Sequence, residues 1–258
     1  MSRYDVVGPL VSDPLPRRRP SPQLVLQGQY CRLERMSASI HSGSLWQAFQ
    51  SADSVWDFMS SGPFRSAEDF AQHLEKLSQP LDPMMFVVVD LRSYKCVGFL
   101  SLMRIDPAAA SIEAGFLTYS PGMQRTVLST EAIFLFMAHA FNDLKYRRFE
   151  WKCNANNVPS VEAAMRFGFS YEGTFRAARI DRGRSRNTAW FSIIESEWPD
   201  REAAFKAYLR RSNFLPKQDT DVPSFTALRQ VKPLSDFLVP DPRRAEAGVL
   251  PLCRRAKL

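Results

Sequence analysis

Residues 118–132 combine the end of an apolar strand, a polar loop and the start of an apolar helix. The first amides of a helix have no partner within the helix, and the helix dipole places partial positive charge there. Such a helix start binds phosphate or pyrophosphate, and Arg125 adds a fixed positive charge. The segment therefore predicts an anion site. The simpler alternative is an ordinary strand-to-helix loop with a Ser or Thr cap.

A second polar stretch, residues 151–160, ends a strand and begins another helix. Asn157 and Ser160 flank this helix start. Asn157 is either an N-cap or a side-chain amide that bonds a ligand entering between two splayed strands.

Hydrophobic periodicity indicates the elements that must position these residues. It predicts strands over 29–36, 84–89, 96–105, 112–119, 149–154, 170–179 and 188–196, and helices over 44–59, 66–77, 129–144, 158–167 and 197–211. The helix over 129–144 is apolar almost all round, which is typical of a helix buried between layers. The order β, αα, βββ, α, β, α, ββ predicts an α/β (α+β mixed) fold with one mixed sheet and helices on both faces.

The chain divides by proline content and charge into three parts. Residues 1–22 form a proline-rich arm, residues 23–211 carry the periodic signals, and residues 212–258 hold six prolines and are expected to form an extended tail. Of the net charge of +7, residues 1–20 carry +2 and residues 213–258 carry +3. The middle is therefore nearly neutral, which argues against a nucleic-acid-binding protein.

Composition excludes several further classes. A chain of 258 residues with 45% hydrophobic residues can build one sizeable core or two small ones. The longest apolar stretch, residues 132–141, falls short of the roughly 18–20 residues that span a bilayer. The first 30 residues lack the apolar region of a secretory signal. Four isolated cysteines and three histidines argue against a structural metal site or a disulfide framework, and favour a reducing compartment.

The chain resembles the GNAT superfamily of acyl-CoA-dependent N-acyltransferases, most of all the branch related to the ribosomal-protein acetyltransferases RimJ and RimL. The resemblance covers roughly residues 28–200. Its motifs are Ile112-Glu113-Ala114-Gly115-Phe116, Thr130-Glu131-Ala132, Tyr146-Arg147-Arg148, Asn157-x-x-Ser160, Arg166-x-Gly168-Phe169, Glu172-Gly173 and Thr188-Ala189-Trp190-Phe191-Ser192.

The resemblance implies a mostly antiparallel sheet splayed between its fourth and fifth strands, with acetyl-CoA in the cleft and no metal. It assigns the pantetheine-facing strand to Phe116, Leu117, Thr118 and Tyr119. It assigns the pyrophosphate loop to Gln124, Arg125, Thr126, Val127, Leu128, Ser129 and Thr130. The opposite wall is expected at Asn154, Asn157 and Ser160.

Two departures from the family pattern bear on activity. The loop pattern is Gln/Arg-x-x-Gly-x-Gly/Ala, and this chain has Gln124, Val127 and Ser129 at those positions. Glycine lets the backbone approach phosphate closely, but backbone amides do the holding, so we expect coenzyme A still to bind. Many family members also have a tyrosine acid where this chain has Ala164. A coenzyme-A-binding relative without transferase activity is therefore an alternative.

The implied chemistry requires a neutral amine to attack the thioester. Glu113 stands where the family often keeps a carboxylate for this task, directly or through water. Glu150 and Glu172 are alternatives, although structural ion pairs are favoured for both. Ser160 and Tyr171 are the nearest replacements for the missing acid. A strand amide near residue 117 or 118 would polarise the thioester carbonyl, and no covalent acyl-enzyme is required.

Two further segments bear on the acceptor and on the cellular address. In the family, the segment that includes Trp56 and Phe64 forms the acceptor wall, although aromatic residues at helical spacing are more often core. A small-molecule amine is the expected acceptor, and a protein N-terminus is the alternative. The final Ala256-Lys257-Leu258 is one substitution from Ser-Lys-Leu, which predicts a peroxisomal import receptor as partner and peroxisomal localisation, otherwise cytoplasmic.

Overall fold

The structure is a computed structural model that describes Gly8, residues 10–214 and Leu234. Within these residues, eight strands form one sheet in the spatial order β1-β2-β3-β4-β5-β6-β8-β7. The strands are β1 Val25–Gln27, β2 Cys31–Arg35, β3 Met84–Asp90, β4 Cys96–Asp106, β5 Ser111–Tyr119, β6 Arg148–Asn154, β7 Ser170–Asp181 and β8 Arg184–Ile194. The α-helices are α1 Ala38–Phe49, α2 Ala67–Ser78, α3 Val127–Ala138, α4 Val158–Arg166 and α5 Trp198–Tyr208.

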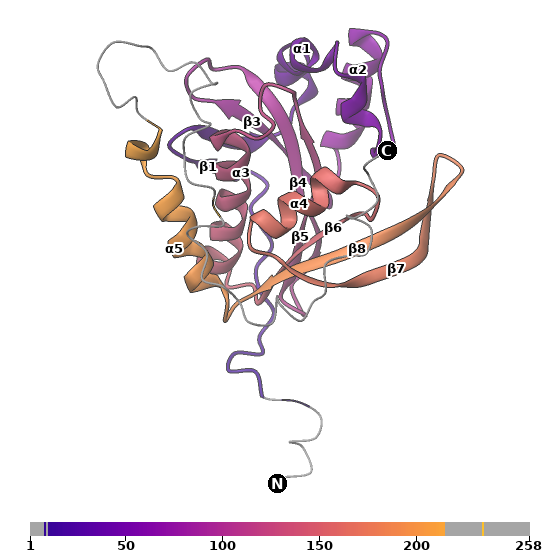
Figure 1. The fold of residues 1–258 in the computed structure, drawn as a ribbon. Coiled ribbons are helices and arrows are strands. Elements are labelled where there is room, and N and C mark those ends of the chain that lie inside the picture. The colour runs from indigo at the N-terminus through magenta and orange to yellow at the C-terminus, as the bar shows by residue number, and fades with distance from the viewer. Residues whose placement is uncertain (1–7, 9, 215–233, 235–258) are drawn as a thin grey trace.

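The sheet separates two hydrophobic cores. Figure 1 shows helices on both faces of the sheet, as the predicted mixed fold requires. Successive side chains of a strand point to opposite faces. In β3 the residues therefore alternate: Met84, Phe86 and Val88 enter the larger core with α3, α4 and α5, and the residues between them enter the smaller core with α1 and α2. Because both faces are covered there, all of β3 is buried.

Local signals explain where two of the helices lie. The Ser66 side chain accepts the Asp69 N–H at 3.1 Å and caps α2, at the residue where the sequence predicts this helix to begin. α3 lies between the sheet and α5, where Phe134 stacks on Trp198 and Phe205. This position explains why α3 is apolar all round.

Several element boundaries differ from the sequence prediction. The helix predicted over 44–59 is instead α1, which ends at Phe49, followed by a short 3₁₀ helix Asp53–Trp56. α1 begins at Ala38, before the predicted start at residue 44. Its buried face includes His41 together with Ala38, Leu45 and Phe49, and a polar residue at that position hides the apolar spacing in the sequence. α3 ends at Ala138 and continues as a π-helical turn, His139–Asp143. β1 was not predicted, since three residues are too few to show alternation.

All strand pairs are antiparallel except β5 with β6. The parallel pairing begins at Ser111 with Arg148 and ends at Ala114 with Trp151, although β5 runs on to Tyr119. The sheet therefore splays between these two strands. They are the strands that the sequence predicts, and they count as the fifth and sixth because β1 precedes them.

The two expected terminal segments lie partly outside the described residues. In the proline-rich arm, Arg17 N–H donates to the Pro107 carbonyl at 2.9 Å and Arg19 donates to the Ile105 carbonyl at 3.1 Å. In the expected tail, Leu234 is buried in the larger core, and Ala256-Lys257-Leu258 lies outside the described residues. No helix within residues 10–214 is long and apolar enough to cross a membrane.

Candidate active site

A bulge in β5 lies directly beyond the point where the parallel pairing ends. Gly115 is opposite Ser101 and Thr118 is opposite Phe99, so two residues of β5, 116 and 117, oppose one of β4. Phe116 has a left-handed φ of 51°. Because β5 has no β6 partner from residue 115 onward among the described pairs, its edge is open toward the splay. The predicted pantetheine-facing residues Phe116, Leu117, Thr118 and Tyr119 all lie on this open segment.

The turn from β5 into α3 leaves the start of α3 without a side-chain cap. Thr126, at the N-cap position, donates its hydroxyl to the Met123 carbonyl at 2.6 Å, and Ser129 donates its hydroxyl to the Thr126 carbonyl at 2.7 Å. Neither hydroxyl accepts a first-turn amide, so the amides of residues 127–129 are left for a ligand. Arg125 is exposed just before this helix start, with a φ of 60°.

These features fit an anion at the start of α3. The helix dipole, the uncapped amides and Arg125 supply positive potential at one place. Val127 and Ser129, which replace the family's small residues, are both buried. Gln124 donates its side-chain amide to the Tyr119 carbonyl at 2.9 Å, which ties the turn to the end of β5. Of the remaining predicted loop residues, Leu128 and Thr130 are buried in the first turns of α3.

The opposite wall of the splay is formed by the end of β6 and the start of α4. The Asn157 side chain accepts the Ser160 N–H at 3.2 Å, so Asn157 is an N-cap, the simpler of the two interpretations. This bond uses the Oδ1 atom of Asn157 and does not involve its Nδ2 hydrogens. Asn154 accepts the Asn156 N–H at 3.0 Å within the same loop.

Ser160 is held by an aromatic residue of the larger core. The indole N–H of Trp151 donates to the Ser160 hydroxyl oxygen at 3.2 Å, and this bond does not use the hydroxyl proton of Ser160. Cys153 also lies close to Ser160, and burial raises the pKa of the Cys153 thiol. Such a thiol has little thiolate character, consistent with the interpretation of Cys153 as a core residue.

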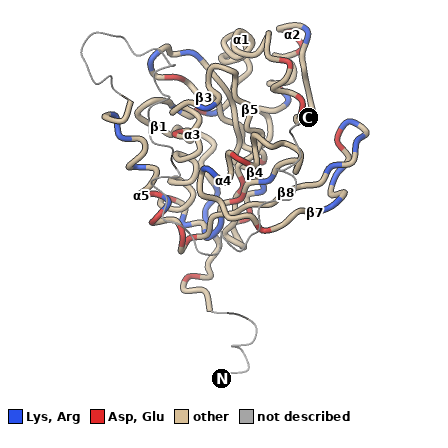
Figure 2. Tube along the Cα trace, viewed as in Figure 1, with Lys and Arg blue, Asp and Glu red and all other residues tan. Residues whose placement is uncertain are grey.

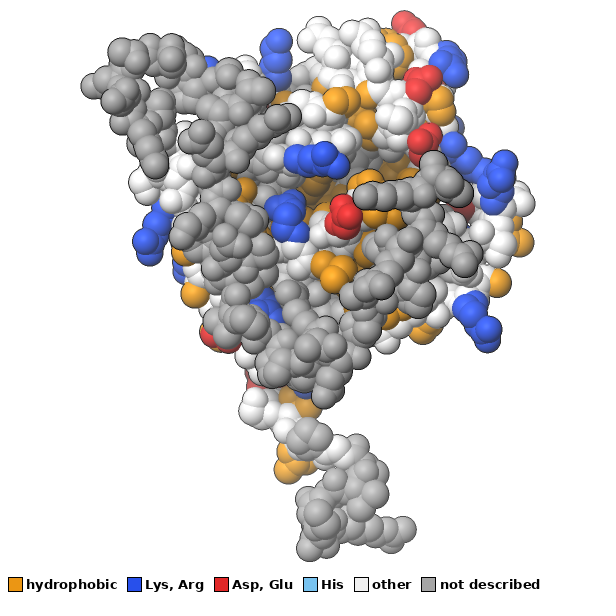
Figure 3. Space-filling view, viewed as in Figure 1, with side chains coloured by type: hydrophobic (Ala, Val, Ile, Leu, Met, Phe, Trp, Pro, Cys, Tyr) orange, Lys and Arg blue, Asp and Glu red, His pale blue; other side chains and the backbone are white. Residues whose placement is uncertain are grey.

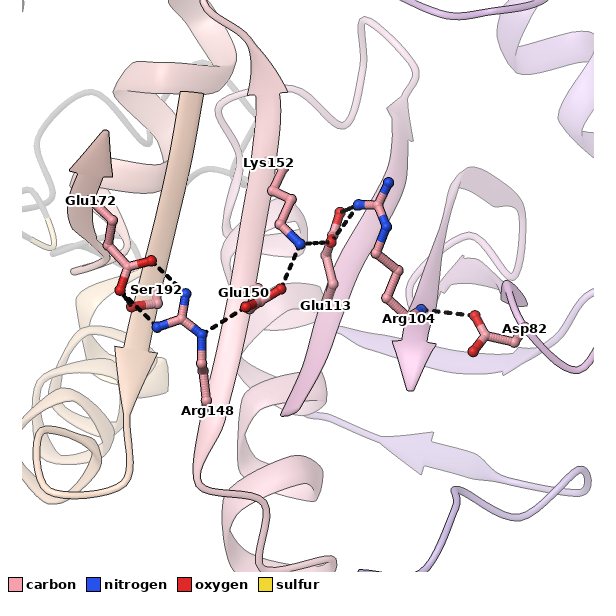
Figure 4. Close-up of polar contacts among 8 residues, drawn as sticks. All are labelled: Asp82, Arg104, Glu113, Arg148, Glu150, Lys152, Glu172 and Ser192. Atoms are coloured by element: carbon pink, nitrogen blue, oxygen red, sulfur yellow. Dashed lines mark hydrogen bonds and ion pairs between the residues drawn. The ribbon is translucent and has the colours of Figure 1, made fainter. Parts of the chain in front are cut away.

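Glu113 is buried on β5, and cations from the two neighbouring strands hold its carboxylate (Figure 4). Arg104 of β4 donates from Nη1 to the two carboxylate oxygens at 2.9 and 2.6 Å, and Lys152 of β6 donates to Oε2 at 2.7 Å. The backbone of Arg104 has a left-handed φ of 46°, and its N–H donates to Asp82 at 2.8 Å. Glu113 is therefore fixed in one position at the base of the splay.

The charged row continues across β6 to β7 (Figure 4). Lys152 also donates to Glu150 at 2.6 Å, Arg148 donates to Glu150 at 2.6 Å and to Glu172, and Ser192 donates to Glu172 at 2.8 Å. Burial opposes ionisation of Glu150, but the hydrogen bonds from Lys152 and Arg148 outweigh it and hold its pKa below the ordinary value. The hydrogen bonds from Arg148 likewise lower the pKa of Glu172. Both carboxylates are in the ion pairs that the sequence analysis favoured.

The structure does not bring all three predicted catalytic residues together. Glu113 faces the side of the sheet that carries α1 and α2, whereas Tyr171 packs against the larger core on the opposite side. The Tyr171 hydroxyl lies 2.8 Å from the Thr174 hydroxyl. Ser160 lies at the start of α4, beside the splay. The catalytic roles of Glu113, Ser160 and Tyr171 therefore stay predictions, and Tyr171 is the farthest from the open edge of β5 in strand order.

The predicted acceptor wall is an aromatic cluster. Trp56 is 2% exposed and packs against Phe64 with ring centroids 5.1 Å apart, and against Phe49, Phe70 and Phe99. Trp56 is therefore a core residue, while Phe64 is half-buried at the edge of the cluster.

Three residues important to the site were not predicted. Arg104 and Lys152 hold Glu113, and Glu131 anchors α3: its carboxylate accepts the N–H groups of Gln29, Tyr30 and Cys31, each at 2.7 Å. A usable signal existed for Lys152, because Arg148, Glu150 and Lys152 alternate along one strand and must share a face. The described residues contain no group of three His, Cys, Asp or Glu side chains that could hold a metal.

Comparison with known proteins agrees with this geometry. Residues 32–170 match the family model described as an acetyltransferase (GNAT) domain. The chain belongs to this family, and it is an acyl-CoA-dependent N-acetyltransferase by family membership.

Individual relatives span most of the chain. A GCN5-related N-acetyltransferase from Brucella melitensis is 39% identical, with a TM-score of 0.80, and the match covers 86% of this chain and 97% of that one. An uncharacterised N-acetyltransferase, p20, from Bacillus licheniformis is 23% identical over 65% of this chain and 95% of its own length. A Salmonella typhimurium acetyltransferase described as modifying the N-terminal serine of ribosomal protein L7/L12 is 20% identical, with a TM-score of 0.56, over 66% of this chain and 99% of that one. This last similarity is one of fold.

Proposed function

We propose that this protein transfers an acetyl group, or another short acyl group, from coenzyme A to the amine of a small molecule by direct attack in a ternary complex. The observation that carries the proposal is the open segment of β5 beside the uncapped start of α3. An extended strand edge and a set of free helix amides lie in sequence along the chain. This order suits a ligand that has an extended amide-containing arm attached to a pyrophosphate.

The residues of the splay fit the coenzyme as follows. The amides of residues 127–129 and the guanidinium of Arg125 would hold the pyrophosphate, and the backbone of Phe116, Leu117, Thr118 and Tyr119 would pair with the pantetheine arm. When bound, the coenzyme supplies an acyl group activated as a thioester. An amide at the bulge, near residue 117 or 118, would donate to the thioester carbonyl and stabilise the charge that develops there.

Glu113 would handle the proton of the acceptor amine. It lies on β5 one residue before Ala114, the last residue of β5 that pairs with β6, so it is close to the open edge. Arg104 and Lys152 keep the carboxylate in place, and a water molecule at its surface would carry the proton from the amine. Ser160, whose hydroxyl proton is free of the Trp151 bond, would donate a hydrogen bond to the departing sulfur.

Two alternatives follow from specific observations. The described activity of the Salmonella typhimurium relative suggests a protein N-terminus as acceptor. Val127 in the pyrophosphate loop and Ala164 in place of the tyrosine acid suggest a coenzyme-A-binding protein without transferase activity.

Incubation with acetyl-CoA and a panel of amines and peptides, followed by thiol release, tests the proposal. Calorimetry with coenzyme A separates binding from turnover. Measurable binding of coenzyme A without turnover of any acceptor would reject the proposal and support a coenzyme-A-binding protein without transferase activity. Acetylation restricted to peptide N-termini would reject a small-molecule acceptor and support a protein N-terminus.

The cellular address is a separate proposal, which rests on the sequence Ala256-Lys257-Leu258. A peroxisome is rich in acyl-CoA, so this location agrees with the chemistry. In a eukaryotic cell, removal of these three residues should release the protein to the cytosol without loss of activity. An unchanged distribution would reject the address.

A further inference from the structure

The charged row on the acceptor side of the sheet neutralises itself. Arg104, Lys152 and Arg148 alternate with Glu113, Glu150 and Glu172, and each carboxylate is bonded to at least one of the cations. An acceptor with several ammonium groups would therefore find no unpaired carboxylate in this row to bind its additional positive charges. Recognition of the acceptor must therefore depend mainly on other groups on this side.

Apolar side chains border the open edge of β5 on this same side. Met59, Phe64 and Phe116 are half-buried and pack on the outside of the smaller core. The Met59 sulfur lies 4.0 Å from the Thr118 hydroxyl, so this apolar group directly adjoins the bulge.

Aromatic side chains lie on the other side of the splay as well. Lys152 Nζ is 3.8 Å from the ring centroid of Trp190, and Trp190 stacks on Phe175 at 4.5 Å. Phe175 is 56% exposed, so its ring is accessible to a ligand. The indole N–H of Trp190 is buried and has no acceptor among the described residues.

The β7–β8 hairpin contacts this region through one arginine and carries positive charge. Arg182 near its tip donates to the Ser61 and Gly62 carbonyls at 2.7 and 2.8 Å, which ties the hairpin to the predicted acceptor wall. Figure 2 shows basic residues, with an acidic stretch among them, toward the hairpin tip, and Arg176, Arg179 and Arg184 of the two strands are exposed. Figure 3 shows the side of the molecule that carries α4, where exposed hydrophobic side chains lie among both basic and acidic ones; the surplus of basic residues belongs to the hairpin. This surplus of cations repels an acceptor with several positive charges.

Resting on the proposed function, we infer that the acceptor is a monoamine on an aromatic-sized apolar skeleton, held between the Met59–Phe64–Phe116 group and the Trp190–Phe175 pair. A polyamine would meet the arginine surplus and a self-neutralised row. A peptide with a polar N-terminal residue would leave the aromatic groups uncovered.

The direct test compares three acceptors in one assay: 2-phenylethylamine, spermidine and a Ser-initiated tetrapeptide, each with acetyl-CoA. The expected kcat/KM for 2-phenylethylamine exceeds the other two by at least about tenfold, since a buried ring contributes on the order of 1.5 kcal/mol or more. Equal or faster turnover of spermidine or the peptide would overturn the inference while leaving the acetyltransferase activity established. No turnover of any acceptor would contradict the proposed function itself.

A matched pair of variants locates the ring. Phe175→Ser should raise KM for 2-phenylethylamine by about fivefold, through loss of an aromatic contact, without changing KM for acetyl-CoA. Ile180→Ser is the control, because Ile180 is 80% exposed on the same strand. An equal effect of both variants, or none from Phe175→Ser, would place the acceptor elsewhere and contradict the inference.

Discussion

Lys152 and Glu113 join β6 to β5 just where the two strands part. The Nζ of Lys152 lies 2.7 Å from Oε2 of Glu113, one residue beyond Trp151, the last residue of β6 that pairs with β5. Both side chains are almost fully buried. This ion pair therefore closes the base of the splay. It also positions the carboxylate that we propose takes the proton of the acceptor amine.

Removing the ammonium of Lys152 should weaken both the fold and the site. Lys152→Met keeps most of the side-chain volume but leaves Glu113 and Glu150 each short of a buried cation. We expect the free energy of unfolding to fall by about 3 kcal/mol, measured by urea denaturation. In the double variant Lys152→Met/Glu150→Gln the loss should be smaller, because one uncompensated charge is gone. A loss in the double variant equal to the sum of the losses in Lys152→Met and Glu150→Gln would show that the two residues are not coupled.

Glu113→Gln should slow the chemical step and leave coenzyme binding nearly unchanged. An amide cannot take the amine's proton, so kcat should fall by about 100-fold. Calorimetry with coenzyme A serves as the control measurement. If coenzyme binding and turnover fall together, Glu113 is a structural residue.

Arg125→Ala should act mainly on coenzyme binding. The guanidinium is exposed beside the uncapped start of α3, so its loss should raise the Kd for coenzyme A by about three- to tenfold. Arg18→Ala, at another exposed position, is the matched control. An unchanged Kd in Arg125→Ala would remove this residue from the phosphate site.

Glu131→Gln should destabilise the protein by about 2–4 kcal/mol, because a buried charged acceptor of three N–H groups becomes a neutral amide with one oxygen. The affected contacts join α3 to the turn between β1 and β2, so hydrogen exchange should rise at Gln29, Tyr30 and Cys31. Unchanged protection of these amides would show that the carboxylate is not needed there.

The charged row should also make stability depend on acid pH. Bonds from Arg148 lower the pKa of Glu172 below its ordinary value of about 4.3 in the unfolded chain. The stabilisation is therefore complete above that value and is lost as the pH falls through the lower folded-state pKa. Tm should be lower in Glu172→Gln than in the wild type at pH 7, and the difference should shrink toward pH 3. A Tm difference between the two proteins that is constant with pH would show that ionisation of Glu172 does not contribute to stability.

The order of elements was largely predictable because each element carries its own period or cap, such as Ser66 before α2. Glu113 was found through a motif within one strand. Its partners Arg104 and Lys152 were not found, since their proximity depends on a bulge in β4 and on the register of β5 with β6. That register follows a long crossover and no local pattern encodes it. Likewise, the contact of Glu131 with Cys31 joins residues 100 positions apart.

The central claim is that the protein transfers an acetyl group from coenzyme A to an amine. The most direct measurement is mass spectrometry of the purified full chain incubated with acetyl-CoA and 2-phenylethylamine, following acetylated amine and free coenzyme A together. We predict that both appear in a 1:1 ratio and that Glu113→Gln slows both equally. Binding of coenzyme A without an acetylated product, on this amine or any other acceptor, would contradict the account.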